Sequence, residues 1–176
     1  IKLQGIKLTI DARYCRVDIW AFERIAKHIE GVFEGIREEW KQKNGGISHT
    51  PDAPFLPVIV HNSEILRLSR KVFDVYKGPL LPADTSCLWT LSLRERLRNR
   101  FIRVILLLGG YLERVEQWRK VIELYESAIG INDLAEEFYL HLMVCYHRLG
   151  QQTEAVKVYR RLQAVLSAAF GIEPSP

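Results

Sequence analysis

The segments RKVIELY at residues 119–125 and EAVKVY at residues 154–159 decide the fold, because the second repeats the pattern of the first at a fixed interval. Tyr125 and Tyr159 lie 34 residues apart, and the same interval separates Leu108 from Leu142. A period of this length, with small and aromatic residues in fixed slots, is typical of helix–turn–helix repeats. Such repeats bury their apolar faces by stacking on neighbours and present surfaces to partners. The pattern therefore predicts an all-α protein that binds a partner or transmits a signal and does not catalyse a reaction.

The predicted architecture is a tetratricopeptide-like, right-handed helical solenoid of about three antiparallel helix pairs. Apolar residues spaced three and four apart, with their capping residues, predict helices over residues 18–42, 62–77, 85–114, 118–131, 134–149 and 153–170. The third helix should run through Gly109 and Gly110, with a close helix crossing to compensate for the two glycines. Gly171 should end the last helix, and the proline-containing residues 47–61 should form an irregular loop.

The first residues alternate between apolar and polar side chains, which predicts a strand at 6–10. A turn at 11–13 and a return strand at 15–17 would complete a β-hairpin. We expect residues 1–17 to be the tail of a missing upstream DNA-binding domain and residues 18–176 to form the helical domain. The hairpin would expose a strand edge, which predicts self-association.

Composition excludes several classes of protein. Among 176 residues, 48% are apolar and 26% are charged, with a net charge of +4, which is a soluble globular balance. The longest apolar stretch is too short to span a bilayer, so no membrane partner is expected and the protein should be cytoplasmic. Three widely spaced cysteines indicate reduced thiols. No nucleotide-binding loop or nucleophile motif occurs, so neither catalysis nor a cofactor is predicted.

Four further segments define the chain more narrowly. They are VDIWAFE at 17–23, VYKGPLLP at 75–82, LRERL at 93–97 and FGIEPSP at 170–176. In this order and at these intervals they resemble the bacterial transcriptional activation domain. That domain is found in antibiotic regulatory proteins and in large ATP-dependent regulators similar to the maltose regulator.

The resemblance implies a winged-helix DNA-binding domain just upstream of residue 18. It also implies that the helical domain helps to dimerise the regulator, orients the winged helix and contacts the transcription machinery, with RNA polymerase as the candidate partner. DNA would then be bound only through the upstream domain. The chain departs from the family pattern in its long loop at 47–61 and in Arg16, which precedes the Val-Asp pair.

The candidate partner-binding residues are basic or aromatic. Arg96, Arg100 and Arg103 share one face of the third predicted helix and could bind phosphate or an acidic protein surface. A solvated helix face is the simpler explanation, because Glu95 lies among the arginines. Trp20 and Trp89 could anchor an interface, since tryptophan is enriched in binding hot spots. Phe22 fits the buried stripe of the first helix, so Trp20 should face away from it, toward the upstream strands.

Other functions remain open from the residues alone. Glu137, His141 and Cys145 are spaced four apart and could meet at a metal, but the repeat register makes Cys145 a packing residue lining the inner surface, so no metal site is predicted. A peptide-binding adaptor would use the concave face of the solenoid. A small-molecule or nucleotide sensor could use Arg160 and Arg161, without support from a phosphate-binding loop.

Overall fold

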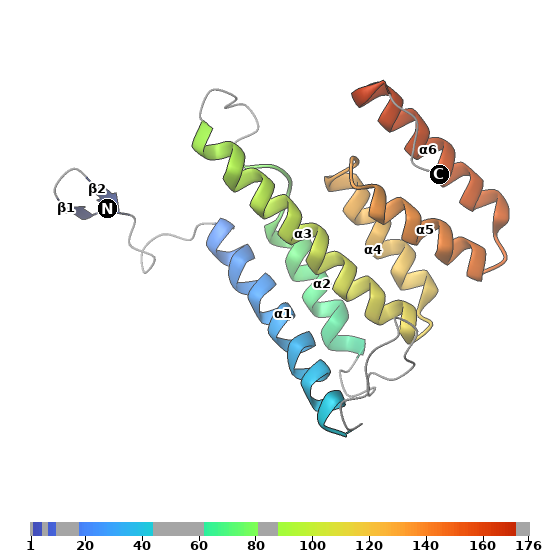
Figure 1. Cartoon of the computed structure of the whole chain (residues 1–176), viewed down its shortest axis with the longest axis horizontal. Helices are drawn as coiled ribbons and strands as arrows, with labels where there is room; N and C mark the ends of the chain where they lie inside the picture. The colour runs from blue at the N-terminus through green and yellow to red at the C-terminus, as the bar shows by residue number, and fades with distance from the viewer. Residues whose placement is uncertain (1, 5–6, 10–17, 44–61, 81–87, 172–176) are drawn as a thin grey trace.

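The structure, a computed structural model, describes residues 2–4, 7–9, 18–43, 62–80 and 88–171. Within these ranges two short strands precede six helices. The helices are α1 (Asp18–Lys43), α2 (Asn62–Val75), α3 (Leu88–Arg114), α4 (Trp118–Ile131), α5 (Glu136–Arg148) and α6 (Gln152–Phe170). Successive helices run in opposite directions and each packs on the one before it (Figure 1). The predicted all-α class is confirmed for the helical region; the right-handed coil stays a prediction.

The predicted hairpin is wrong in its pairing. The strands are β1 (Lys2–Gln4) and β2 (Lys7–Thr9), which pair antiparallel with Lys2 opposite Thr9. The expected strand at 6–10 overlaps β2, but its partner precedes it along the chain instead of following it. The expected turn at 11–13 and return strand at 15–17 lie outside the described residues.

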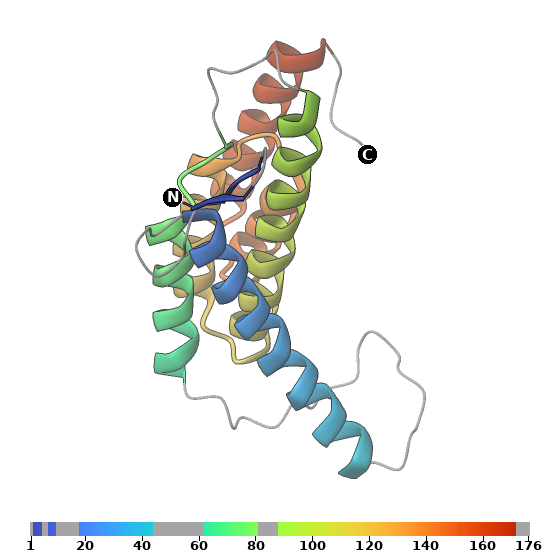
Figure 2. The ribbon, with the colours of Figure 1, turned by 90° about the vertical axis from the view of Figure 1, so that its left-hand side faces the viewer.

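Helix α1 lies along α2 and α3, and its second half extends beyond both (Figure 2). The apolar residues spaced three and four apart that predict this helix run from Phe22 to Trp40. Phe22, Ile29, Phe33 and Ile36 are buried and Ile25 is half-buried, which confirms the apolar stripe as far as Ile36. The side chain of Trp40, the last member, lies outside the described part. These residues join α1 to one apolar core that continues to α6.

Helix α3 continues through both glycines to Arg114, as predicted. A methyl group at Gly109 would overlap the hydroxyl and ring of Tyr125 on α4, whereas one at Gly110 would meet nothing. The expected close crossing is therefore confirmed at Gly109 and absent at Gly110. The first three residues of the predicted helix, 85–87, lie outside the described ranges.

Aromatic rings join the helical pairs into one stack. Phe101 of α3 meets Phe138 of α5 edge to face, with ring centroids 6.2 Å apart, and stacks on Tyr76 at 4.4 Å. Gly171 follows α6 with a φ of 67°, the left-handed conformation that ends a helix, as predicted. Helix α5 is slightly shorter than the predicted 134–149, and the predicted loop at 47–61 lies outside the described ranges.

Candidate interaction site

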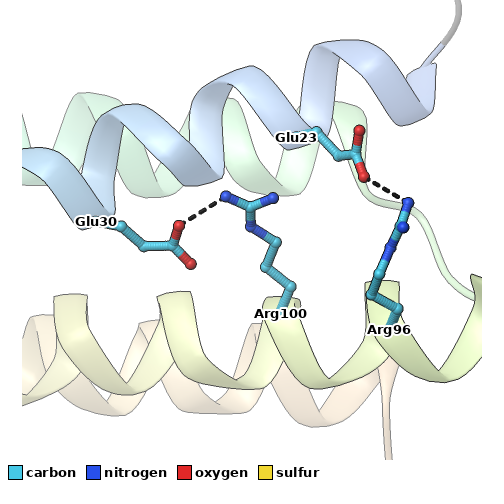
Figure 3. Close-up of polar contacts among 4 residues, drawn as sticks. All are labelled: Glu23, Glu30, Arg96 and Arg100. Carbon is cyan, nitrogen blue, oxygen red and sulfur yellow. Dashed lines mark hydrogen bonds and ion pairs between the residues drawn. The ribbon is translucent and has the colours of Figure 1, made fainter.

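The arginine face of α3 forms ion pairs within the chain. Arg96 meets Glu23 at 2.9 Å and Arg100 meets Glu30 at 2.6 Å, so both guanidinium groups reach across to α1 (Figure 3). The Arg96 side chain is 65% exposed and the Arg100 side chain 27%, which makes the second pair the better shielded from water. Exposed pairs contribute little, so the Arg100 pair should contribute more of the attachment between the helices.

Sequence reasoning missed these acidic partners. Glu23 and Glu30 are seven residues apart, which is two turns along one face of α1. Nothing in the local sequence indicates that this face meets α3. Nε of Arg100 is also buried without a hydrogen-bond partner among the described residues, so Glu30 is important for compensating that side chain's charge.

Two of the remaining partner-binding candidates, Arg103 and Trp20, have exposed side chains. Arg103 is exposed and borders an open hollow of about 490 Å³ that Ile102, Leu106 and Glu137 also line. Phe22 is buried and Trp20 is exposed. The prediction that Phe22 packs in the core while Trp20 faces away from it is therefore confirmed. The side chain of Trp89 lies outside the described residues. Partner binding by these residues stays a prediction.

A second hollow joins two of the segments singled out in the sequence. It measures about 400 Å³ and is lined by the start of α1, including Ile19 and Phe22, and by residues 75–80, including Tyr76 and Leu80. The Phe22 and Tyr76 rings lie 4.9 Å apart on its wall. The VDIWAFE and VYKGPLLP segments are therefore in contact, although residues 17, 81 and 82 lie outside the described ranges.

A polar cluster links α3, α4 and α5. The Tyr125 hydroxyl donates to Oε1 of Glu113 at 2.9 Å, and Nδ1 of His141 lies 2.8 Å from the same oxygen. The His141 ring also packs on the Tyr125 ring, with centroids 5.3 Å apart. The Glu113 carboxylate thus connects α3 to α4 and α5. No spacing in the sequence predicted this cluster.

The environment of this cluster shifts its ionisation. Hydrogen bonding and charge from Glu113 raise the pKa of His141 above 6.5 against the effect of burial. Burial would raise the pKa of Glu113, but the bonds from His141 and Tyr125, with the charges of His141 and Arg114, hold it below 4.5. Burial first, and Glu113 second, raise the pKa of Tyr125 well above its usual value. Glu113 is therefore ionised around neutral pH, and we call its contact with His141 the Glu113–His141 clasp.

Cys145 is buried, which confirms a packing role but not the predicted position on the inner surface. Burial raises its pKa to about 12, so the thiol is protonated near neutral pH. Among residues that the structure describes, no group of three histidine, cysteine or acidic side chains could hold a metal ion. Arg161, proposed above for a sensor, pairs instead with Glu126 at 2.9 Å.

In the described part of the chain, no helix has the length and apolar character needed to cross a membrane.

Comparison with known families identifies the domain. A profile described as the bacterial transcriptional activator domain matches residues 62–176, from α2 through the end of the chain. The chain belongs to this family, as the sequence resemblance predicted, and is a module associated with transcription activators. Three of the four diagnostic segments fall inside the matched range; VDIWAFE and all of α1 precede it. The searches of curated proteins and of solved structures found no match.

Proposed function

We propose that this chain is the non-catalytic regulatory and oligomerisation module of a bacterial transcription regulator, coupling protein contacts to a DNA-binding domain that precedes it. The membership of residues 62–176 in the activator-domain family is the observation that supports this most strongly. The stacked helices suit the role, because repeats of this kind bury a continuous core and offer extended surfaces. The setting would be the cytoplasm, where transcription regulators act on DNA.

Helix α1 is the proposed mechanical connection. It directly follows residues 1–17, which we assign to the tail of an upstream winged-helix domain, and it lies outside the matched family range. The Arg96–Glu23 and Arg100–Glu30 pairs hold it on α3, and Phe22 packs against Tyr76 of the 75–82 segment. A rigid α1 would transmit the orientation of the helical body to the DNA-binding domain.

The proposed partners follow from this arrangement. Trp20 and Arg103 are exposed and available for a protein such as RNA polymerase, and Trp89 is a further candidate on sequence grounds. Arg96 and Arg100 would act inside the domain, because each already has a carboxylate partner. The chain would also self-associate, and DNA would be bound only through the upstream domain.

The division of labour is tested by titrating the 176-residue chain with duplex DNA at physiological salt. We expect binding no tighter than roughly micromolar, in the range of non-specific contacts. Tight binding that depends on sequence would contradict the proposal. The reading frame upstream of Ile1 offers a second test, since it should encode a winged-helix pattern over roughly a hundred residues, the size of a small domain.

A second candidate is a peptide-binding adaptor, which the hollow beside Arg103 favours because its walls include Ile102, Leu106 and Leu107. An extended peptide lying there would contact α3 and the start of α5. Leu106→Glu should then abolish capture of that peptide while leaving the DNA titration unchanged. Retention of transcriptional activity in Leu106→Glu would favour the regulatory module over the adaptor.

A further inference from the structure

The hollow between the start of α1 and the end of α2 has a mostly apolar lining. It combines the buried rings of Phe22 and Tyr76 with the half-buried aliphatic side chains of Ile19, Val75 and Leu80. It is more enclosed than the hollow on α3. Its volume of about 400 Å³ lies within the range of small-molecule sites, which are usually concave and apolar with a few polar groups. The walls therefore suit a ligand with an apolar body.

Two charges of opposite sign border this hollow. Asp18 is the first residue of α1 and Lys77 follows α2 by two residues; both side chains are exposed and both line the hollow. Among the described residues, no ion pair joins Asp18 to Lys77 or either of them to a third side chain. An apolar hollow with an unpaired anion and an unpaired cation on its border is complementary to a zwitterion that has an apolar side chain.

We propose that this hollow binds a free amino acid with a large apolar side chain. The ammonium group of the ligand would face the Asp18 carboxylate, and its carboxylate would face the Lys77 ammonium. Its side chain would lie against the apolar lining. A ligand with a single charge would match one of the two residues and meet a like charge at the other, which is unfavourable. The inference goes beyond the regulatory role proposed above and does not depend on it.

The proposal is tested by titrating the isotope-labelled 176-residue chain with L-phenylalanine and following amide chemical shifts by NMR. We expect saturable shifts around Ile19 and Lys77, with a dissociation constant below about 1 mM, which is modest for a small ligand. Glycine has the same two charges but no apolar side chain, so it should cause no saturable shift there. Failure of L-phenylalanine to bind, or equal binding of glycine, would overturn the proposal.

Two analogues of phenylalanine assign the charged contacts. Lys77→Gln should weaken L-phenylalanine binding about two- to fivefold, as expected for an exposed ionic contact, and should not weaken binding of 2-phenylethylamine, which lacks the carboxylate. Asp18→Asn should weaken L-phenylalanine binding by a similar factor and should not weaken binding of 3-phenylpropionate, which lacks the ammonium group. The matched control is Lys71→Gln, which removes a charge from an exposed position of α2 outside the lining and should change nothing.

A space-filling variant tests the apolar contact. Ile19→Trp should remove detectable L-phenylalanine binding, because the indole ring would take the place of the ligand side chain. Leu91→Trp adds the same ring at an exposed position of α3 outside the lining and should bind as the wild type does. Circular dichroism establishes that both variants are folded. Binding that survives in folded Ile19→Trp, or that responds equally to Lys77→Gln and Lys71→Gln, would overturn the assignment of the site.

Discussion

Two neighbouring glycines on α3 differ in the space that surrounds them. Gly109 faces α4, where the buried Tyr125 ring leaves no room for a methyl group, while Gly110 points to open space. Tyr125 cannot easily retreat, because its hydroxyl is held by Glu113 and its ring lies between α3 and α5. Adding one methyl group at Gly109 and, for comparison, at Gly110 therefore tests the contact between α3 and α4.

Gly109→Ala should lower the free energy of unfolding by about 1 to 3 kcal/mol, the usual cost of overpacking a filled core. The matched control, Gly110→Ala, should raise it by up to about 1 kcal/mol, because alanine favours a helix over glycine and meets no neighbour. Urea denaturation of both variants measures the difference. Equal effects of the two substitutions would show that Tyr125 does not pack against Gly109.

The Glu113–His141 clasp should make stability depend on pH. The raised pKa of His141 means that its contribution is fully present below pH 6.5, its unfolded value, and is lost as pH rises through the higher folded value. The lowered pKa of Glu113 means that its contribution is present above pH 4.5 and is lost as pH falls through the lower folded value. The clasp should therefore be strongest between these two values.

His141→Gln provides the comparison. The stability difference between wild type and variant should be greatest between pH 4.5 and 6.5 and should shrink on the alkaline side, because neutral histidine no longer attracts the Glu113 carboxylate. Thermal denaturation across the pH series measures it, with His147→Gln as a control on the exposed end of α5. A difference that grows toward alkaline pH would reverse the assigned sign.

At the scale of elements, the most informative contact is the attachment of α1 to α3. The two ion pairs have the same chemistry but differ in exposure, and the shielded guanidinium of Arg100 has a buried Nε with no partner in the described part of the chain. Loss of its carboxylate would leave a partly buried charge uncompensated, which costs more than loss of an exposed pair.

Glu30→Gln should therefore lower the free energy of unfolding by about 1 to 2 kcal/mol, while Glu23→Gln should cost less than about 1 kcal/mol. Chemical denaturation monitored by far-ultraviolet circular dichroism measures both. The exchange Glu30→Arg/Arg100→Glu should restore part of the loss by re-forming the pair in the opposite sense. If Glu23→Gln proved the more damaging change, the shielded pair would not be the principal attachment.

The elements that were predictable are those with a strong local pattern. The boundaries of α4 follow from the 34-residue repeat, and the continuation of α3 through Gly109 follows from the same register. The N-terminal strands were misplaced because a three-residue strand has little periodicity. The Arg100–Glu30 pair and the Glu113 clasp join residues far apart along the chain, so helical spacing contained no information about them.

At the scale of the whole molecule, the six helices form one stack with distinct ends. The α1 end lies next to the segment proposed to lead to a DNA-binding domain, and α6 forms the other end (Figure 1). The family assignment covers the stack from α2 onward. The proposed regulator would therefore carry its DNA-binding domain at the α1 end of this stack.

The central claim is that this chain regulates transcription through protein contacts and not through DNA contacts of its own. The most direct test fuses the 176-residue chain to an unrelated DNA-binding domain and measures transcription from a promoter that contains the matching operator. The fused chain should change the transcript level severalfold, whereas the same chain expressed unfused should leave it unchanged. A fused chain with no effect on transcription, while remaining folded and bound at the operator, would contradict the claim.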